Sequence, residues 1–404
     1  MSDPGVVIVG GSLGGLRAAE QLRSAGHTGP LRVIGEEVHL PYNRPPLSKD
    51  VLADPGDDDV DRLHATLAFR RRASVADVEF LLGSAAVGAE LGARTVRLDD
   101  GATLSYDGLV VATGLRARRL DLPGPAAGRH VIRTLDDALG LRAAIASRPS
   151  VVVIGSGFVG CETAASLHTL GLAVTVVDPA EVPFARALGP RLGGAVRRHL
   201  ERAGVTFAMG VGVAGYAGTE AVTGVILADG RVLDAGLVVE AVGSRCNTEW
   251  LDGNGLDLGD GVLTDNNLAV AGTERVVAVG DVARFPNPLV DDVPRRVEHW
   301  SMPTDTAKRA AATLVAQLTD EPAPDTPFTP IPSFWSDLLD LRLQAFGSPA
   351  LADEAILEEG DVDRLADGAL ITYRRSGLLI GTVAVNLPPA RQRQLRERFL
   401  ERVS

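Results

Sequence analysis

The sequence has few of the residues that mark disulfide-stapled, metal-bound or membrane-spanning proteins. Its two cysteines, Cys161 and Cys246, lie far apart and form no CxxC pair, and its seven histidines show no paired ligand spacing. We therefore predict neither a disulfide scaffold nor a metal site. No run of 18 apolar residues occurs, so we expect no helix that spans a bilayer.

Positive charge is also scarce. The 40 basic residues are outnumbered by 52 acidic ones, which gives a net charge of −12, and the only lysines are Lys49 and Lys308. Such an acidic chain is a poor partner for nucleic acid or for an anionic membrane. The first strand-like run begins at Val6, which leaves no room for a secretory signal before it. We therefore expect a cytoplasmic protein.

Apolar runs alternate with helical patterns along most of the 404 residues. With 45% hydrophobic and 23% charged residues, the composition is typical of a globular protein of two to three domains. The alternation predicts the α/β class. Five prolines between Pro322 and Pro332 predict a linker, and the tail from about residue 333 has the alternation of a small α+β domain.

Two segments follow one plan, which indicates an internal repeat. Each has a Val-rich run, a glycine loop (residues 10–15 and 155–160), a helical stretch, and a second strand that ends in an acid. Each also has a later Asp-Gly hairpin turn and an apolar strand that ends near a glycine, at one common offset. We infer two related dinucleotide-binding modules. The acids are Glu36 and Asp178, and the closing glycines are Gly114 and Gly243.

A glycine loop between a strand and a helix forms a pyrophosphate site, because backbone N–H groups and the helix dipole face the phosphates. The second loop carries the complete pattern Gly155-x-Gly157-x-x-Gly160 with Phe158 and Val159 inside it, whereas the first has Ser12 in the middle place. Asp178 is positioned to bind the 2′-OH of NADH and to repel a 2′-phosphate, so we predict NADH over NADPH. Two such sites suggest one tightly bound cofactor and one exchanged cofactor.

Five motifs in order give the chain a specific resemblance, and they cover nearly its whole length. They are residues 40–49 (LPYNRPPLSK), 133–138 (RTLDDA), 280–283 (GDVA), 298–300 (EHW) and 334–337 (FWSD). The sequence resembles the FAD-dependent NADH:ferredoxin reductases of oxygenase systems, of the putidaredoxin reductase and biphenyl dioxygenase reductase type. The resemblance implies electron transfer from NADH through FAD to a small iron–sulfur ferredoxin, usually [2Fe-2S], which supplies a cytochrome P450 or a ring-hydroxylating dioxygenase.

The resemblance also implies a glutathione-reductase-like fold. It has two Rossmann-like dinucleotide-binding domains and a small α+β C-terminal domain. The expected boundaries are 1–114 and 245–325 for the FAD-binding domain, 115–244 for the NADH-binding domain and 326–404 for the C-terminal domain.

The matched motifs imply further site residues. Glu36 would hold the adenosine ribose of FAD, with Glu37 as the alternative, and Val87 would offer its backbone to the adenine. The remaining residues expected around FAD are Gly10, Ser12, Leu13, Gly14, Gly15, Arg44, Lys49, Ala112, Thr113, Gly114, Arg133, Gly280, Asp281, Glu298, His299, Trp300 and Trp335. Those expected around NADH are Gly155, Gly157, Phe158, Val159, Gly160, Asp178 and Gly243.

Two residues are candidates for the chemistry itself. Lys49 would lie against the flavin ring, where a cation favours the negative charge gained on reduction, and Glu162 resembles the family acid that pairs with it. A solvated lysine and a helix acid placed by the dipole are the alternatives. Trp335 is either an anchor for ferredoxin or a core residue. The arginine clusters 70–72 and 295–296 are either steering charges or solvated faces.

The cysteine positions separate this chain from other enzymes of the same fold. Disulfide reductases need a dithiol and NADH peroxidases need a single cysteine in the loop that holds residues 43–46, and neither is present. Cys161 is expected to be a small packing residue, and we have no functional account of Cys246. Two other functions stay open: an NADH oxidase-type flavoenzyme and a redox-sensing flavoprotein of the apoptosis-inducing-factor type.

Overall fold

The computed structural model describes residues 5–53 and 60–400 and divides into two compact units. Unit 1 comprises Met1–Asn43, His64–Arg116 and Arg245–Ser333, and unit 2 comprises Arg44–Leu63, Ala117–Ser244 and Phe334–Ser404. Each unit therefore brings together stretches that are far apart in the sequence. The elements that cross the boundaries are α3 (Val60–Leu67), β7 (Leu115–Ala117), β16 (Ser244–Cys246) and β21 (Ser333–Leu338).

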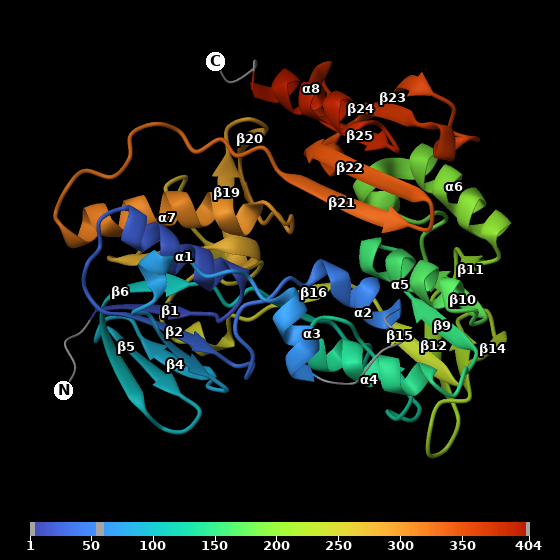
Figure 1. Cartoon of the computed structure of the whole chain (residues 1–404), viewed down its shortest axis with the longest axis horizontal. Coiled ribbons are helices and arrows are strands. Elements are labelled where there is room, and N and C mark those ends of the chain that lie inside the picture. The colour runs from blue at the N-terminus through green and yellow to red at the C-terminus, as the bar shows by residue number, and fades with distance from the viewer. Residues whose placement is uncertain (1–4, 54–59, 401–404) are drawn as a thin grey trace. The chain divides into compact units, whose positions relative to one another are not determined.

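Unit 1 is built on a parallel sheet in the order β3-β2-β1-β6, with β18 beside β6. All five residues of β1 are buried, as expected for a parallel strand covered on both faces. Helices α1 and α7 lie side by side on this sheet (Figure 1). The bounds are β1 Gly5–Val9, α1 Leu13–Ser24, β2 Leu31–Gly35, β3 Glu79–Leu82, β6 Thr103–Val111, β18 Val276–Ala278 and α7 Met302–Leu318.

The long strand β6 also joins an antiparallel extension of unit 1. It pairs with β5, which pairs with β4, and the Asp100-Gly101 turn connects β5 to β6 as the sequence predicts. A separate small sheet has the order β17-β19-β20. The bounds are β4 Ala86–Glu90, β5 Thr95–Leu98, β17 Val262–Leu263, β19 Ala283–Asn287 and β20 Asp291–Arg295.

Unit 2 repeats the parallel plan in the sheet β11-β10-β9-β15-β8. Its hairpin strands form a sheet of their own, in the order β12-β13-β14. The two copies therefore differ in how the hairpin is attached. The bounds are α2 Asp50–Ala53, β8 Arg129–His130, α4 Leu135–Ile145, β9 Val151–Ile154, α5 Phe158–Thr169, β10 Val174–Asp178, α6 Ala185–Ala203, β11 Thr206–Met209, β12 Val213–Ala217, β13 Gly224–Leu227, β14 Val232–Asp234 and β15 Leu237–Glu240.

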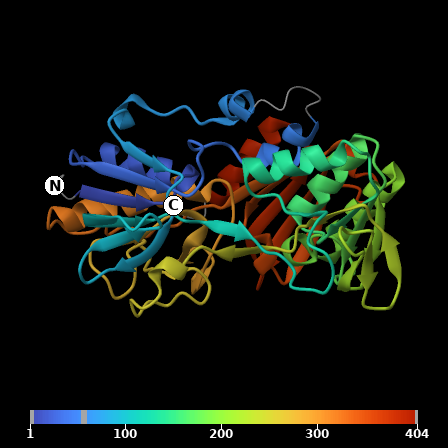
Figure 2. The same ribbon diagram turned by 90° about the horizontal axis from the view of Figure 1, so that it is seen from below.

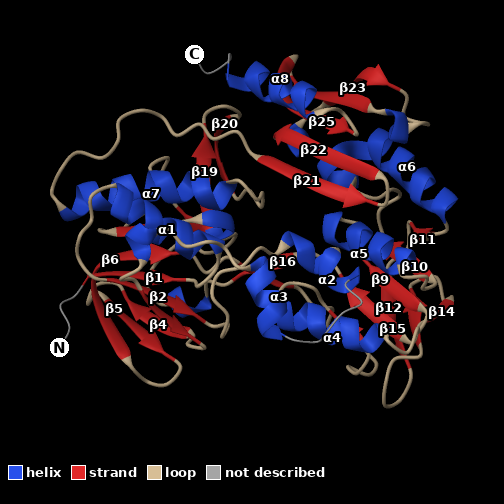
Figure 3. Cartoon of the chain, viewed as in Figure 1, coloured by secondary structure: helices blue, strands red, loops and turns tan. Residues whose placement is uncertain are grey.

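The tail of the chain folds as an antiparallel sheet with one helix and packs within unit 2. Leu343 and Val383 from this sheet share one buried core with Leu188 and Leu192 of α6. Figure 2 shows the red tail strands next to the green helices, and Figure 3 shows the same strands by type. In sheet order the strands are β21 (Ser333–Leu338), β22 (Leu341–Gly347), β25 (Leu378–Val385), β24 (Ala369–Arg375) and β23 (Glu354–Gly360), and the helix is α8 (Pro389–Leu400).

The proline-rich segment expected to be a linker has no regular structure between α7 and β21, but it is fixed to unit 1. The backbone N–H of Phe328 donates to the Asn266 side chain at 2.7 Å, and Asn287 donates to the Pro330 carbonyl at 3.0 Å. The segment is therefore packed against unit 1 and is not a free linker. Among the described residues, no helix combines the length and apolar character needed to cross a membrane.

Candidate active site

The glycine loop of unit 1 follows β1 and is fixed by close backbone contacts. Gly10 has a φ of +128°, and a Cβ on it would lie 2.1 Å from the Ala112 carbonyl oxygen. A Cβ on Gly15 would lie 1.9 Å from the Gly10 carbonyl oxygen. Neither separation is possible for a real side chain, so both positions require glycine.

The glycine loop of unit 2 repeats these contacts. Gly155 has a φ of +103°, and a Cβ on it would lie 2.2 Å from the Ala241 carbonyl oxygen. A Cβ on Gly160 would lie 2.0 Å from the Gly155 carbonyl oxygen. The same steric requirement at matching positions makes the two loops structural copies of each other.

The middle position of the second loop has room for a side chain, and serine takes the corresponding place in the first loop. Ser12 and Gly157 both have extended backbone, and a Cβ on Gly157 would meet nothing within 4 Å. Gly157 has no side chain, and in the described contacts the Ser12 side chain makes no cap bond to α1. The first N–H groups of α1 and α5 are therefore available to a pyrophosphate, and both loops fit a bound dinucleotide.

Most of the residues predicted for FAD gather at one edge of the unit 1 sheet. Because β1, β2, β6 and β18 run parallel, their carboxyl ends meet there. Gly10 N donates to Ile34 O at 2.8 Å, and Ala112 N donates to Val9 O at 2.8 Å. The residues placed at this edge are Gly10, Ser12, Leu13, Gly14, Gly15, Glu36, Ala112, Thr113, Gly114, Gly280 and Asp281.

The structure distinguishes the two acids that follow β2. Glu37 is half-buried, and its carboxylate accepts a hydrogen bond from the Tyr42 hydroxyl at 2.5 Å. Glu36 is exposed directly after Gly35, the last residue of β2. Glu36 is thus the acid that faces solvent beside the glycine loop, which favours it over Glu37 as the ribose acid.

Val87 lies at a bulge in β4. The pairing of β4 with β5 shifts register between Ala86 and Gly88, so Val87 has no paired residue in β5. Its side chain is 42% exposed. A bulge leaves the backbone groups of the extra residue outside the sheet hydrogen bonds, as the proposed adenine contact requires.

Other predicted residues of unit 1 are held by protein partners. Thr113 donates through Oγ1 to the Asn247 carbonyl at 2.6 Å, and Glu298 accepts from Arg296 at 2.8 Å. Trp300 is 42% exposed, and its Nε1 donates to Asn43 at 3.3 Å. Burial lowers the pKa of the His299 imidazole to about 4, so His299 is neutral at physiological pH.

In unit 2, Asp178 ends β10 and reaches back to the glycine loop. Its Oδ2 accepts from the backbone N of Ser156 at 2.7 Å and from the Ser156 hydroxyl at 2.9 Å. Its Oδ1 accepts from Ala180 N at 2.8 Å. Ser156 is 2% exposed, so Asp178 holds the glycine loop through a buried residue.

Further predicted residues meet in unit 2. Arg44 donates to the Arg133 carbonyl, although the two are 89 positions apart. Phe158 packs on Phe334 of β21 with ring centroids 4.7 Å apart, whereas Val159 is 43% exposed. Gly243 has a φ of +93° just after β15. The RTLDDA motif also has a local explanation, because Thr134 and Asp137 form the capping box of α4.

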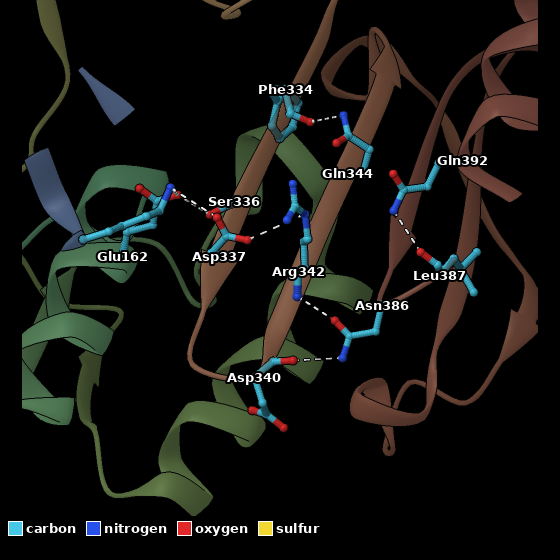
Figure 4. Close-up of polar contacts among 11 residues, drawn as sticks. Glu162, Phe334, Ser336, Asp337, Asp340, Arg342, Gln344, Asn386, Leu387 and Gln392 are labelled. Atoms are coloured by element: carbon cyan, nitrogen blue, oxygen red, sulfur yellow. Dashed lines mark hydrogen bonds and ion pairs between the residues drawn. The ribbon is translucent and has the colours of Figure 1, made fainter. Parts of the chain in front are cut away.

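Lys49 and Glu162 form an ion pair inside unit 2. Lys49 Nζ lies 2.9 Å from Glu162 Oε1 and 3.7 Å from Asp337 Oδ2. Glu162 lies near the start of α5 and is 6% exposed, and Figure 4 shows it facing β21 with Ser336 and Asp337. Burying such a pair is tolerated only when its remaining hydrogen-bonding groups are satisfied. Ser48 and Ser336 supply such partners to the Glu162 carboxylate.

Trp335 is half-buried on β21, at the edge of the C-terminal sheet, and does not belong to the buried core of unit 2. This placement favours a surface anchor over a core residue. Four arginines of the two clusters contact acids or rings: Arg72 lies 3.5 Å from Glu20, Arg71 lies over Phe80, Arg295 lies 2.5 Å from Asp291 and Arg296 lies 2.7 Å from Asp260. Those contacts favour a structural role over partner steering.

Both cysteines are free thiols. Cys161 is fully buried, its Sγ donates to the Ser156 carbonyl at 3.4 Å, and burial raises its pKa. Burial also raises the pKa of Cys246. A thiol is reactive as the thiolate, so neither site favours nucleophilic chemistry. Cys161 is a packing residue, as the sequence predicts.

Comparison with known proteins identifies the family. Residues 4–308 match the model described as pyridine nucleotide-disulphide oxidoreductase. The chain belongs to this family. Proteins similar to it include the ferredoxin reductase component of chlorobenzene dioxygenase from Cupriavidus sp. (strain PS12). That relative is 34% identical over 387 residues, which cover 95% of this chain and 89% of the relative.

Other members give the same result. The ferredoxin--NAD(+) reductase component of the biphenyl dioxygenase system from Paraburkholderia xenovorans is 33% identical, with 90% of this chain and 88% of the relative covered. The covalent putidaredoxin reductase–putidaredoxin complex matches with a TM-score of 0.88 and 28% identity, covering 100% of this chain and 94% of that one. These comparisons confirm the predicted fold class and the predicted resemblance to ferredoxin reductases.

Sequence reasoning missed three residues of the Lys49 site. Ser48, Ser336 and Asp337 lie inside the quoted motifs, but no role was assigned to them. Ser156 was likewise overlooked as the contact of Asp178. The only available signal was membership of a motif, because each contact joins segments that are distant in sequence.

Proposed function

We propose that this protein transfers electrons from NADH, through bound FAD, to a small iron–sulfur ferredoxin. In this proposal the ferredoxin, of the [2Fe-2S] or another cluster type, supplies a cytochrome P450 or a ring-hydroxylating dioxygenase. The observation that carries the proposal is the pair of matching glycine loops, each at the carboxyl edge of its own parallel sheet. One chain thereby holds two dinucleotides.

When bound, a flavin accepts a hydride, which carries two electrons and one proton. It can then release the electrons one at a time to one-electron acceptors. The chain's own residues bind the two cofactors and orient them. In unit 1, Gly10 and Gly15 shape the pyrophosphate loop, Glu36 binds the ribose and Val87 offers backbone to the adenine. In unit 2, Gly155, Gly157 and Gly160 bind the NADH pyrophosphate. In this proposal residues 1–114 and 245–325 form the FAD-binding domain, residues 115–244 the NADH-binding domain and residues 326–404 the C-terminal domain.

Lys49, held by Glu162, is assigned to the flavin ring, and Arg44, Arg133, Trp300 and Trp335 are assigned around it. Support comes from the buried ion pair and from the Arg44–Arg133 contact. A cation near the ring favours the negative charge that accompanies reduction. We also place the protein in the cytoplasm, where NADH is supplied.

The test is stepwise transfer with purified protein. The holoprotein should be yellow, NADH should bleach the flavin absorbance, and cytochrome c should be reduced rapidly only when a ferredoxin is added. Fast oxygen consumption without ferredoxin would favour the NADH oxidase function. Slow turnover with every ferredoxin tried would favour a redox-sensing flavoprotein. Protein that stays colourless after incubation with FAD would exclude all three.

A further inference from the structure

Three segments of unit 2 meet at the Glu162 carboxylate. Glu162 Oε2 accepts from the Ser48 hydroxyl at 2.9 Å, and Oε1 accepts from the Ser336 hydroxyl at 2.8 Å. Lys49 Nζ lies 2.9 Å from the same Oε1. Ser48 and Ser336 are 4% and 0% exposed. Both oxygens of this carboxylate therefore have donors from the protein interior.

The two hydroxyls are carried by backbone that is itself fixed. Ser48 ends the short 3-10 turn at residues 45–48, and its carbonyl accepts from the Ser166 hydroxyl of α5 at 2.7 Å. Ser336 lies in β21, which pairs with β22. Lys49 thus follows a turn that is hydrogen-bonded to α5. Ser336, the second residue that contacts Glu162 Oε1, belongs to the C-terminal sheet.

A second carboxylate competes for Lys49. Asp337 Oδ2 lies 3.7 Å from Lys49 Nζ, and its other oxygen lies 3.9 Å from Arg342 Nε (Figure 4). Asp337 is 39% exposed, so water weakens its attraction relative to that of buried Glu162. The Lys49 ammonium accordingly lies closer to Glu162 than to Asp337.

We propose that Ser336 is a positioning residue that keeps the Lys49 ammonium on Glu162 rather than on Asp337. Its hydroxyl occupies one lone-pair direction of Oε1 and so fixes the rotation of the carboxylate. Without it, Glu162 rotates and Asp337 draws the ammonium away. This inference rests on the proposed function, because the assignment of Lys49 to the flavin comes from there.

The experiment compares variants of the FAD-loaded protein by stopped-flow reduction with NADH and by the midpoint potential of the bound flavin. Ser336→Ala should lower the limiting reduction rate about tenfold, the effect of losing one hydrogen bond to a charged group. The Kd for NADH should not change. The midpoint potential should fall, in the same direction as in Lys49→Met.

Rescue distinguishes positioning from a structural role. In the Ser336→Ala background, Asp337→Asn removes the competing charge and should restore both the rate and the potential. The matched control is Thr382→Val, which removes another fully buried hydroxyl of the C-terminal sheet, one with no hydrogen-bond partner in the described structure. It should behave as wild type. If Ser336→Ala does not fold, Ser336→Cys carries the same prediction, because it keeps the volume and weakens the donor.

The experiment distinguishes failure of the Lys49 assignment from failure of the Ser336 inference. If Lys49→Met leaves the midpoint potential unchanged, Lys49 is not at the flavin, and both the assignment and this inference are overturned. If Lys49→Met lowers the potential but the Ser336 variant matches wild type, only the inference is overturned. A Ser336 defect that Asp337→Asn fails to reverse would also overturn it.

Discussion

Asp178 is expected to determine both the affinity for NADH and the discrimination against NADPH. Its two oxygens accept three protein hydrogen bonds, two from Ser156 and one from Ala180. A carboxylate has about four lone-pair positions, so acceptor capacity remains for one ribose hydroxyl. Replacement of Asp178 by alanine removes the ribose contact and also releases the loop through Ser156.

The magnitude follows from these contacts. A hydrogen bond to a charged group contributes about 1.5 to 3 kcal/mol, and 1.4 kcal/mol corresponds to a tenfold change in affinity. Asp178→Ala should therefore raise the Kd for NADH by at least about tenfold. The Kd for NADPH should rise less, because the same change removes repulsion of the 2′-phosphate. Ser156→Ala keeps the backbone bond to Asp178, so its effect should be about fivefold.

The assay is stopped-flow flavin reduction over a range of NADH and NADPH concentrations, which separates Kd from the limiting rate. Asp229→Ala is the matched control, since it removes one acid at the exposed β13–β14 turn, where Asp229 binds Arg231. An unchanged ratio of the two Kd values in Asp178→Ala would refute the reasoning. A wild-type preference for NADPH would do the same.

Three further predictions concern stability and FAD affinity. The pKa of His299 is lowered from 6.5 to about 4 in the fold, so the unfolded chain binds this proton first as pH falls. His299 should therefore lower the free energy of unfolding by about 2 kcal/mol between pH 7 and 5. His299→Gln should flatten the pH dependence of this free energy in urea unfolding. Equal slopes against pH in wild type and variant would contradict the prediction. Thr134→Ala breaks the capping box of α4 and should cost about 1 kcal/mol in the same assay, whereas an unchanged midpoint would argue against the cap. Glu36→Gln should weaken FAD binding in fluorescence titration more than Glu37→Gln does, because Glu37 is committed to Tyr42; the reverse order would exchange the two roles.

The sequence by itself determined the two glycine loops and the elements around them. At Gly10 and Gly155 the positive φ and the close carbonyl oxygen exclude any side chain, so the requirement is visible in the residue type. The apolar runs, the Asp-Gly turns and the helix that follows each loop are likewise local patterns. They were enough for the α/β class and for two dinucleotide-binding modules, whereas FAD was implied by the family resemblance of the longer motifs.

Only the tertiary structure shows which side chains contact one another at each candidate site. Glu36 and Glu37 are adjacent in the sequence, and the Tyr42 contact separates them. The Ser336 hydroxyl reaches Glu162 across 174 positions. Such pairings leave no periodic signal, because they depend on how sheets and helices pack rather than on spacing along the chain. A buried carboxylate must nevertheless find hydrogen-bond donors, and packing alone determines which residues supply them.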